Sequence, residues 1–350
     1  MLHYSYFKRT LEFAFDARTS RGEIKKHAAY IIEVRDLLKP EVIGRGEASP
    51  LNGLSIDSHD DFENQLKNIL QELNNGLRPE DINLLRLPSI RFALETAMAD
   101  LHFGGQMKVF DNEFNRGKAI PINGLIWMAD KQKMLQEAQE KIEKGFNCIK
   151  LKVGNLDFDE ECRLIESIRK NNSAYKLEIR LDANGAFEPH EAIEKLKELH
   201  RFEIHSIEQP IKPKQVDWME EICRKAPIHI ALDEELIGID VEEMGFRLIK
   251  KIKPKYIILK PTLIGGFSTC DKWINLADKS KIGWWLTSAL ESNVGLNAIA
   301  QYASYLKVKN HQGLGTGSLY QNNFPSPLLV ENGYLHFSDI KKWNFEENDL

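Results

Sequence analysis

From about residue 120 onward the sequence repeats one pattern, a short apolar segment with strand character followed by a longer amphipathic segment with helix character. CIKLKV at 148–153 is one such strand, and DEECRLIESIRK at 159–170 is the helix expected after it. Strands that alternate with helices pair in parallel, and eight of them suffice to close into a barrel. We therefore expect eight barrel strands, at 122–128, 148–153, 177–184, 204–210, 228–235, 256–261, 283–288 and 312–317.

The residues before this repeat have a different organisation. They begin with segments rich in aromatic and β-branched residues, which predict antiparallel strands. Two one-sided apolar stripes follow, at 62–73 and 92–101, and they predict helices. Strands first and helices afterwards form an α+β arrangement. We therefore expect an α+β domain at 1–118, a (β/α) barrel domain at 119–320, and a C-terminal segment at 321–350 that returns to the first domain.

Charge and composition exclude several classes of function. A formal net charge of −5 over 350 residues leaves no basic surface of the kind that nucleic acid needs. No apolar stretch approaches the roughly 18 residues of a membrane span, and the N-terminus lacks the pattern of a signal peptide. The four cysteines are scattered without a C-x-x-C pair, which favours reduced thiols over disulfides or structural zinc. We expect a cytoplasmic protein with a small-molecule partner, and we leave its oligomeric state open.

Five charged residues stand at the ends of five successive expected strands. They are 25 to 30 residues apart along the chain, which is about the length of one strand–helix unit in such a barrel. Because active sites of these barrels are built at the C-terminal ends of the strands, the five side chains should meet at one mouth. They are Lys152, Asp182, Glu208, Asp233 and Lys260.

Each of these residues has an ordinary explanation when taken alone. An aspartate after a strand is usually a helix cap or a turn residue, and this applies to Asp182 and Asp233. A glutamate before proline, such as Glu208, is more often part of a surface turn. A lysine late in a strand usually reaches for water, which is the better explanation of Lys150 alone. Independent caps and surface charges have no reason to share the period of a barrel, so the shared period favours a functional site.

The chemistry of the set explains why these residue types belong together. Three carboxylates supply the hard oxygen ligands that Mg²⁺ prefers. A substrate carboxylate on that ion is polarised, and the ion stabilises the enediolate that forms when the neighbouring proton is removed. The base then has to be a neutral amine. Positive charge on Lys150, Lys260 and Mg²⁺ disfavours a further charge on Lys152, which makes Lys152 the expected base.

The motifs K-L-K, D-A-N, E-Q-P, D-E and L-K-P, on the second to sixth expected strands, resemble the enolase superfamily and its muconate-lactonising subgroup. The resemblance covers nearly the whole chain. It implies an α/β fold, a (β/α)7β barrel with an α+β capping domain. It also implies site residues, with Mg²⁺, or Mn²⁺ in its place, as the cofactor: metal ligands Asp182, Glu208 and Asp233, the acid/base residue Lys152 with its counterpart Lys260, and the neighbouring Lys150, Asn184 and Glu234.

Two further stretches resemble the o-succinylbenzoate synthases of this subgroup. Residues 44–55 are similar to the mobile capping loop of that family, and residues 287–301 and 312–324 are similar to its seventh and eighth strand ends. The sequence departs from the pattern at Ala289, where a hydroxyl is common. The resemblance implies that the substrate carboxylates lie near these strand ends, among Ser288, Glu291, Ser292, Gly315, Thr316 and Gly317.

The reaction implied by the resemblance is the dehydration of 2-succinyl-6-hydroxy-2,4-cyclohexadiene-1-carboxylate to o-succinylbenzoate, a step of menaquinone biosynthesis. The partner is then a small dicarboxylate. An N-acyl amino acid racemase or dipeptide epimerase is the closest alternative, because it would use both lysines as acid and base. A cycloisomerase comes next. A non-catalytic Mg²⁺-binding scaffold is disfavoured, since both lysines and all three carboxylates are present.

Overall fold

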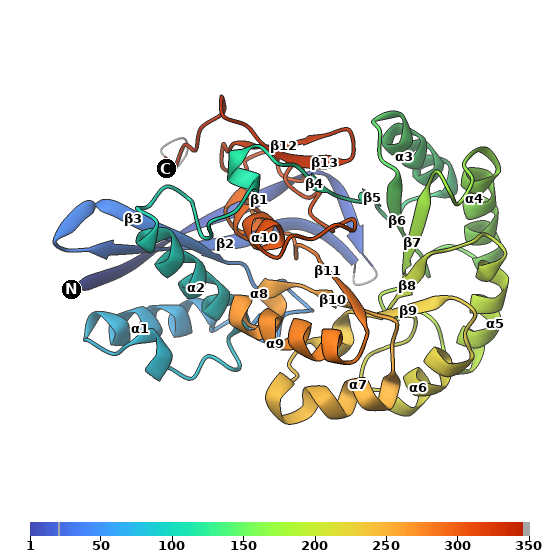
Figure 1. The fold of residues 1–350 in the computed structure, drawn as a ribbon, viewed down its shortest axis with the longest axis horizontal. Coiled ribbons are helices and arrows are strands. Elements are labelled where there is room, and N and C mark those ends of the chain that lie inside the picture. The colour runs from blue at the N-terminus through green and yellow to red at the C-terminus, as the bar shows by residue number, and fades with distance from the viewer. Residues whose placement is uncertain (20–21, 346–350) are drawn as a thin grey trace.

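The computed structural model describes residues 1–19 and 22–345. Its N-terminal part is an antiparallel sheet in the order β1-β2-β3, covered by two helices (Figure 1). A short 3-10 turn, η1, lies between these helices, and a second, η2, follows them. The bounds are β1 (Leu2–Thr19), β2 (Gly22–Asp36), β3 (Lys39–Ala48), α1 (Phe62–Asn74), η1 (Pro79–Asp81), α2 (Pro88–His102) and η2 (Phe114–Arg116).

Two glycines of β3 allow α2 to pack directly on the sheet. A Cβ atom at Gly46 would lie 1.9 Å from the carbonyl oxygen of Ala93, and one at Gly44 would lie 2.1 Å from that of Ala97. Real Cβ atoms do not approach backbone that closely, so no larger residue fits at either position. The close approach fixes β3, and with it the segment that leads from β3 towards the barrel.

The second part of the chain is a parallel sheet whose seven strands follow one another in sequence order. Two isolated parallel bridges, Thr287 to Gly313 and Ile122 to Gln312, join its two ends and close the ring. The expected eighth strand at 312–317 is therefore reduced to bridging residues. The strands are β5 (Gly124–Ile126), β6 (Cys148–Lys152), β7 (Glu178–Asp182), β8 (Ser206–Glu208), β9 (His229–Leu232), β10 (Tyr256–Leu259) and β11 (Gly283–Leu286).

Helices between the strands cover the outside of this sheet (Figure 1). Their inner faces are apolar, as in α4, where Cys162, Ile165 and Ile168 are buried in the main core. No helix among the described residues has the length and apolar character needed to cross a membrane. The bounds are α3 (Lys131–Glu143), α4 (Phe158–Asn171), α5 (Pro189–His200), α6 (Val216–Lys225), η3 (Glu234–Leu236), η4 (Val241–Gly245, a π-helical turn), α7 (Phe246–Ile252), α8 (Pro261–Ile264), α9 (Gly266–Lys279) and α10 (Asn293–Tyr305).

The end of the chain contacts both parts of the molecule. Tyr320 bridges to Phe13 of β1, and the backbone N–H of Gln321 donates to the carbonyl of Glu12. The final hairpin, β12 (Leu328–Glu331) and β13 (Tyr334–Phe337), pairs instead with β4 (Ile120–Pro121), just before the barrel. The domain boundaries at residues 118 and 320 stay a prediction.

Candidate active site

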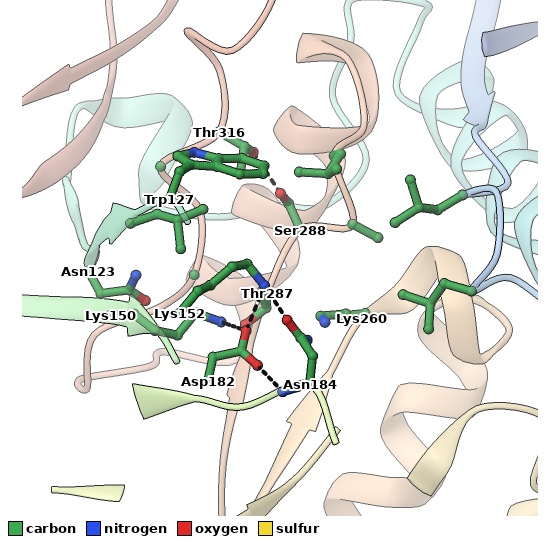
Figure 2. Close-up of a pocket in the computed structure, with 17 residues that line it drawn as sticks. Asn123, Trp127, Lys150, Lys152, Asp182, Asn184, Lys260, Thr287, Ser288 and Thr316 are labelled. Atoms are coloured by element: carbon green, nitrogen blue, oxygen red, sulfur yellow. Dashed lines mark hydrogen bonds and ion pairs between the residues drawn. The ribbon is translucent and has the colours of Figure 1, made fainter. Parts of the chain in front are cut away.

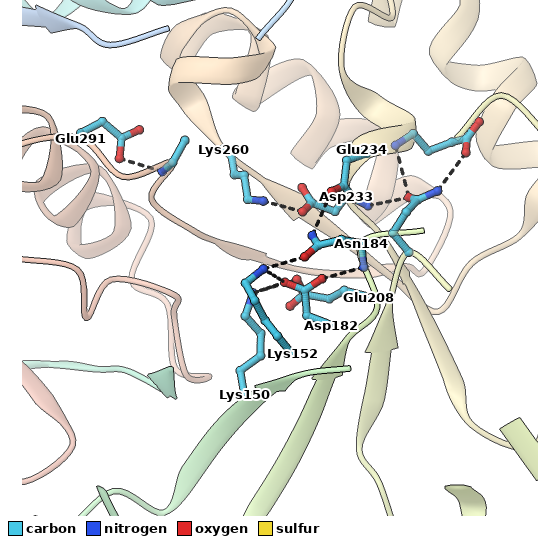
Figure 3. A network of polar contacts seen from close by, with 12 residues as sticks. Lys150, Lys152, Asp182, Asn184, Glu208, Asp233, Glu234, Lys260 and Glu291 are labelled. Atoms are coloured by element: carbon cyan, nitrogen blue, oxygen red, sulfur yellow. Dashed lines mark hydrogen bonds and ion pairs between the residues drawn. The ribbon is translucent and has the colours of Figure 1, made fainter. Parts of the chain in front are cut away.

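The register of the parallel strands brings the expected site residues to one level. Lys152 of β6 pairs with Asp182 of β7, and Asp182 pairs with Glu208 of β8. Asp233 comes directly after β9, and Lys260 directly after β10. The five side chains, from five successive strands, converge at the C-terminal end of the barrel (Figure 3).

Lysines and carboxylates alternate within this cluster. Lys150 and Lys152 are two residues apart, so both point to the same face of β6. The Lys150 amine lies 2.8 Å from Glu208 Oε2, and the Lys152 amine lies 3.1 Å from Asp182 Oδ2. Lys260 forms an ion pair with Asp233. Lys150 is only 5% exposed, so the ordinary explanation that it reaches for water is wrong.

The electrostatics of the cluster follow from burial and from these pairs. Burial raises the pKa of Asp233 to about 7, although Lys260 opposes the shift, and burial likewise raises the pKa of Glu208. Burial acts the same way on Asp182, but Lys152 and Lys150 outweigh it and hold its pKa below the usual range. Burial alone would lower the pKa of Lys150, but the carboxylates of Glu208 and Asp182 raise it. The cluster is thus a dense set of mutually compensating charges.

Asn184 connects Lys152 to a further carboxylate. Its Oδ1 accepts a hydrogen bond from the Lys152 amine at 2.7 Å, and its Nδ2 donates to Glu234 Oε1 at 3.0 Å. Asn184 has a positive φ of 44°, a conformation that asparagine tolerates better than most residues. Of the predicted neighbours, Asn184 therefore lies beside Lys152, and Glu234 lies beside Asn184.

One buried carboxylate oxygen bears on whether this cluster fits a metal ion. Within residues 1–19 and 22–345, Glu208 Oε1 is buried and has no hydrogen-bond partner. Such an atom costs about 1–3 kcal/mol when nothing satisfies it, and more when it is charged. Hard carboxylate oxygens are the ligands that Mg²⁺ prefers. The residues present therefore fit a divalent cation.

A second group of potential ligand atoms lies at the opposite end of the strands. Among the described residues, only Cys148, Glu178 and His311 offer three His, Cys, Asp or Glu ligand atoms within 4.8 Å of one another. The Arg180 guanidinium lies 2.6 Å from Glu178 Oε1. Because a fixed cation already occupies this site, we do not assign a metal to it.

A pocket opens above the charged cluster (Figure 2). Its floor holds Lys152 and Lys260, and part of its wall is apolar. Leu51 and Leu54 come from the loop after β3, residues 49–56, which we call the lid. The capping loop expected at 44–55 is therefore shorter at its start, because residues 44–48 belong to strand β3. Trp127 lies across the pocket from Lys152 (Figure 2). The pocket thus combines a charged floor with apolar walls, as small-molecule sites usually do.

The structure brings some of the predicted substrate contacts to this pocket. Ser288, Gly315 and Thr316 line it, and the hydroxyls of Ser288 and Thr316 lie 2.6 Å apart. Gly317 is not among the lining residues, and an added Cβ there would lie 3.1 Å from Asn293 Oδ1.

Glu291 and Ser292 also lie outside the pocket lining, because both are bound elsewhere. Glu291 accepts hydrogen bonds from the Thr262 hydroxyl and the Ala289 N–H, both at short range. Ser292 caps α10 through the N–H of Val294, and its own hydroxyl donates to Glu47. These two residues therefore hold the loop after β11 in place without lining the pocket.

Sequence reasoning missed several lining residues. Asn123, Leu125 and Trp127 all line the pocket, and they alternate along the first expected strand and its end. Because side chains of a strand alternate between two faces, this spacing was a usable signal. Glu47 had no such signal, because its partners lie 245 and 248 residues away.

Comparison with known proteins agrees with this geometry. The family described as "Enolase C-terminal domain-like" matches residues 133–341. The o-succinylbenzoate synthase of Desulfotalea psychrophila is 41% identical over 96% of this chain and 99% of its own length. The crystal structure of MenC from the same organism superposes with a TM-score of 0.85 and 39% identity, covering 96% of this chain and 99% of that chain.

A more distant structure shows the fold alone. The dipeptide epimerase of Enterococcus faecalis, complexed with Mg and the dipeptide L-Leu-L-Tyr, has a TM-score of 0.81 at 19% identity and covers 97% of each chain. The predicted enolase-superfamily fold is confirmed by these matches. Full-length similarity at 41% identity places the sequence more narrowly: the chain belongs to the o-succinylbenzoate synthase family of the enolase superfamily.

Proposed function

We propose that this chain dehydrates 2-succinyl-6-hydroxy-2,4-cyclohexadiene-1-carboxylate to o-succinylbenzoate and so serves menaquinone biosynthesis. One observation carries the proposal beyond family membership. Lys152 and Lys260 face one pocket from β6 and from the end of β10, which are separated by three strands in the sheet. A substrate ring between them has an amine on one face and an ammonium group on the other.

Lys152 is the acid and base of the proposed reaction. Its amine takes the proton from the ring carbon that carries the carboxylate, and the bonding electrons stay on the substrate. The same electrons then expel the hydroxyl group from the neighbouring carbon, and Lys152 returns the proton so that water leaves. The hydrogen bond to Asn184 Oδ1, at 2.7 Å, fixes the direction of the Lys152 amine before the substrate arrives.

Lys260 keeps its positive charge in this proposal. Burial opposes that charge, but Asp233 and Glu234 raise the pKa of Lys260. A cation on the second face of the ring stabilises the negative charge left by proton removal. Leu51, Leu54 and Trp127 exclude water from the apolar part of the ring.

Asp182, Glu208 and Asp233 would hold Mg²⁺, or Mn²⁺ in its place. The unpartnered Glu208 Oε1 among the described residues supports this assignment, as does the Mg present with a distant relative of the same fold. When bound, the ion supplies positive charge to the substrate carboxylate. Lys152 and Lys260, which pair with Asp182 and Asp233, are also the two lysines that the reaction needs.

The two lysines also distinguish the proposal from its rival. An epimerase needs both as acid and base, because the proton leaves one face of the substrate and arrives at the other. The rival deserves a test, because the epimerase of Enterococcus faecalis shares the fold and is complexed with a dipeptide.

The test is steady-state dehydration with Mg²⁺, followed by loss of the diene absorbance. Lys152→Ala should lose about 10²–10⁴-fold or more, because the residue acts in both proton transfers. Lys260→Arg should keep part of the activity, whereas Lys260→Ala should lose about a hundredfold. N-acyl amino acids and dipeptides in D₂O are the parallel assay. If the wild type exchanges their α-proton quickly and dehydrates nothing, the epimerase replaces the synthase.

A further inference from the structure

A second hollow lies outside the active-site pocket, on the other side of the lid. It has a volume of about 490 Å³ and runs between the lid and the loops that follow β6, β7 and β8. Leu54 and Asn184 line both this groove and the active-site pocket. The groove is therefore adjacent to the pocket, and Leu54 and Asn184 lie at their common border.

The lid is held at both ends and within itself. At its start, Glu47 accepts hydrogen bonds from the backbone of Ser292 and Gly295 in the barrel. At its end, Asp57 accepts from the backbone and the hydroxyl of Ser89 at the beginning of α2. Inside the lid, the N–H of Leu51 donates to the Ser55 hydroxyl at 2.7 Å. Because these hydrogen bonds hold the lid in place, the groove is a fixed feature of the surface.

Two lysines supply the charge of the groove. Lys212 and Lys214 line it and are exposed to solvent. Their backbone is fixed, because the N–H of Lys214 donates to Glu235 Oε1 at 2.9 Å and the carbonyl of Ile211 accepts from Gln209. An added Cβ at Gly185 would lie 2.9 Å from the Cα of Lys212, so the two loops are in direct contact.

The opposing charge in the groove is small. Glu234 is its acidic lining residue, and Asn184 donates a hydrogen bond to that carboxylate. The neighbouring Glu235 is buried and is engaged by Lys214 and Gln209. The groove thus has a positive rim in a protein whose formal net charge is −5. Such a local field concentrates anions and raises their association rate by about 10- to 1,000-fold in favourable cases.

We propose that this groove is the outer binding site and access route for the anionic substrate. The inference rests on the proposed function, because the cyclohexadiene substrate carries two carboxylates. Lys212 and Lys214 capture the dianion, and displacement of the Leu54 side chain admits it to the pocket. The lysines act before the chemical step, so they affect kcat/KM and leave kcat at saturation nearly the same.

The chain offers a matched control pair. Lys253 and Lys255 are also exposed and also two residues apart, and Lys253 has a positive φ of 53°, close to the 69° of Lys214. They lie before β10, at the opposite end of the barrel strands. Lys212→Glu with Lys214→Glu, and Lys253→Glu with Lys255→Glu, change the net charge equally.

The experiment measures dehydration by wild type and both double variants with Mg²⁺ at several ionic strengths. In the groove variant, kcat/KM should fall about tenfold at low salt and approach the wild-type value as salt screens the charges. The control variant should stay within about twofold of wild type. The double alanine variant of the groove should fall between wild type and the glutamate variant.

The possible outcomes distinguish failure of the groove proposal from failure of the proposed function. If the wild type dehydrates the substrate and the groove variant matches the control at low salt, the groove proposal is wrong and the synthase remains. If both variants fall equally, net charge and not the groove governs capture. If the wild type dehydrates nothing, the proposed function fails and the groove loses its ligand with it.

Discussion

Replacing Glu47 with glutamine tests the contact between the capping sheet and the barrel. Glu47 is the second-last residue of β3 and is fully buried, and its two oxygens accept four hydrogen bonds of 2.5 to 2.8 Å. Two of the donors are hydroxyls, on Ser49 and Ser292, which can rotate. The other two are the backbone N–H groups of Ser292 and Gly295, which cannot. Each oxygen accepts from one fixed donor and one hydroxyl.

This arrangement makes glutamine a poor substitute whichever way its amide is turned. Its NH₂ group would always face one backbone N–H, so one hydrogen bond to a charged acceptor is lost and one buried donor is left without a partner. Loss of a hydrogen bond to a charged group costs about 1.5–3 kcal/mol, so we expect Glu47→Gln to lower the free energy of unfolding by about 2–4 kcal/mol. Ser49→Ala removes one hydroxyl donor but leaves no buried donor without a partner, so it should cost less, about 1.5 kcal/mol.

Urea unfolding of wild type and both variants measures these differences. Amide hydrogen exchange shows where the structure is loosened. Only Glu47→Gln should accelerate exchange at residues 292–295, while α5 should exchange as in wild type. The loop from Ser288 to Leu290 lines the pocket, so KM should rise with this loosening. A glutamine variant as stable as Ser49→Ala, with unchanged exchange at the start of α10, would refute the reasoning.

Three further predictions follow from the same structure. Replacing Asp182, Glu208 or Asp233 with alanine should abolish dehydration and weaken Mg²⁺ binding in a titration. EDTA should abolish the activity of the wild type until Mg²⁺ or Mn²⁺ is restored. Gly46→Ala should cost more than about 3 kcal/mol in urea unfolding, because its Cβ would lie 1.9 Å from backbone. His27 is buried and its pKa is lowered to about 4, so its stabilising contribution is present above pH 6.5 and is lost as the pH falls towards 4. Between pH 7 and pH 4.5, the free energy of unfolding should fall by about 2 kcal/mol less in His27→Leu than in wild type.

The sequence predicts the barrel well because its signal is local. Each barrel strand is a short apolar run, and a parallel partner is available only through the helix that follows. The charged residues could be placed because strand period and register are regular, as the pairing of Lys152, Asp182 and Glu208 shows. The eighth strand was harder, since QGLGTG carries three glycines in six residues and forms only isolated bridges.

The walls of the site could not be predicted in the same way. The side of a loop that faces a pocket depends on contacts with distant segments. Ser292 faces away because it caps α10 and binds Glu47 of the first sheet. Lys150 is buried because Glu208, on a strand two places away, accepts its charge. Neither contact has a signature in the neighbouring residues.

The pairing of the two chain ends has a consequence for how the protein is made. Leu11 and Phe13 of β1 share one apolar cluster with Leu319, Tyr320 and Phe324. A ribosome releases these partners some 300 residues after the first strand, so the inner face of the N-terminal hairpin stays uncovered during most of translation. Contacts of such long sequence separation slow folding. This face of the N-terminal sheet therefore cannot be fully covered before residues 319–324 have been made.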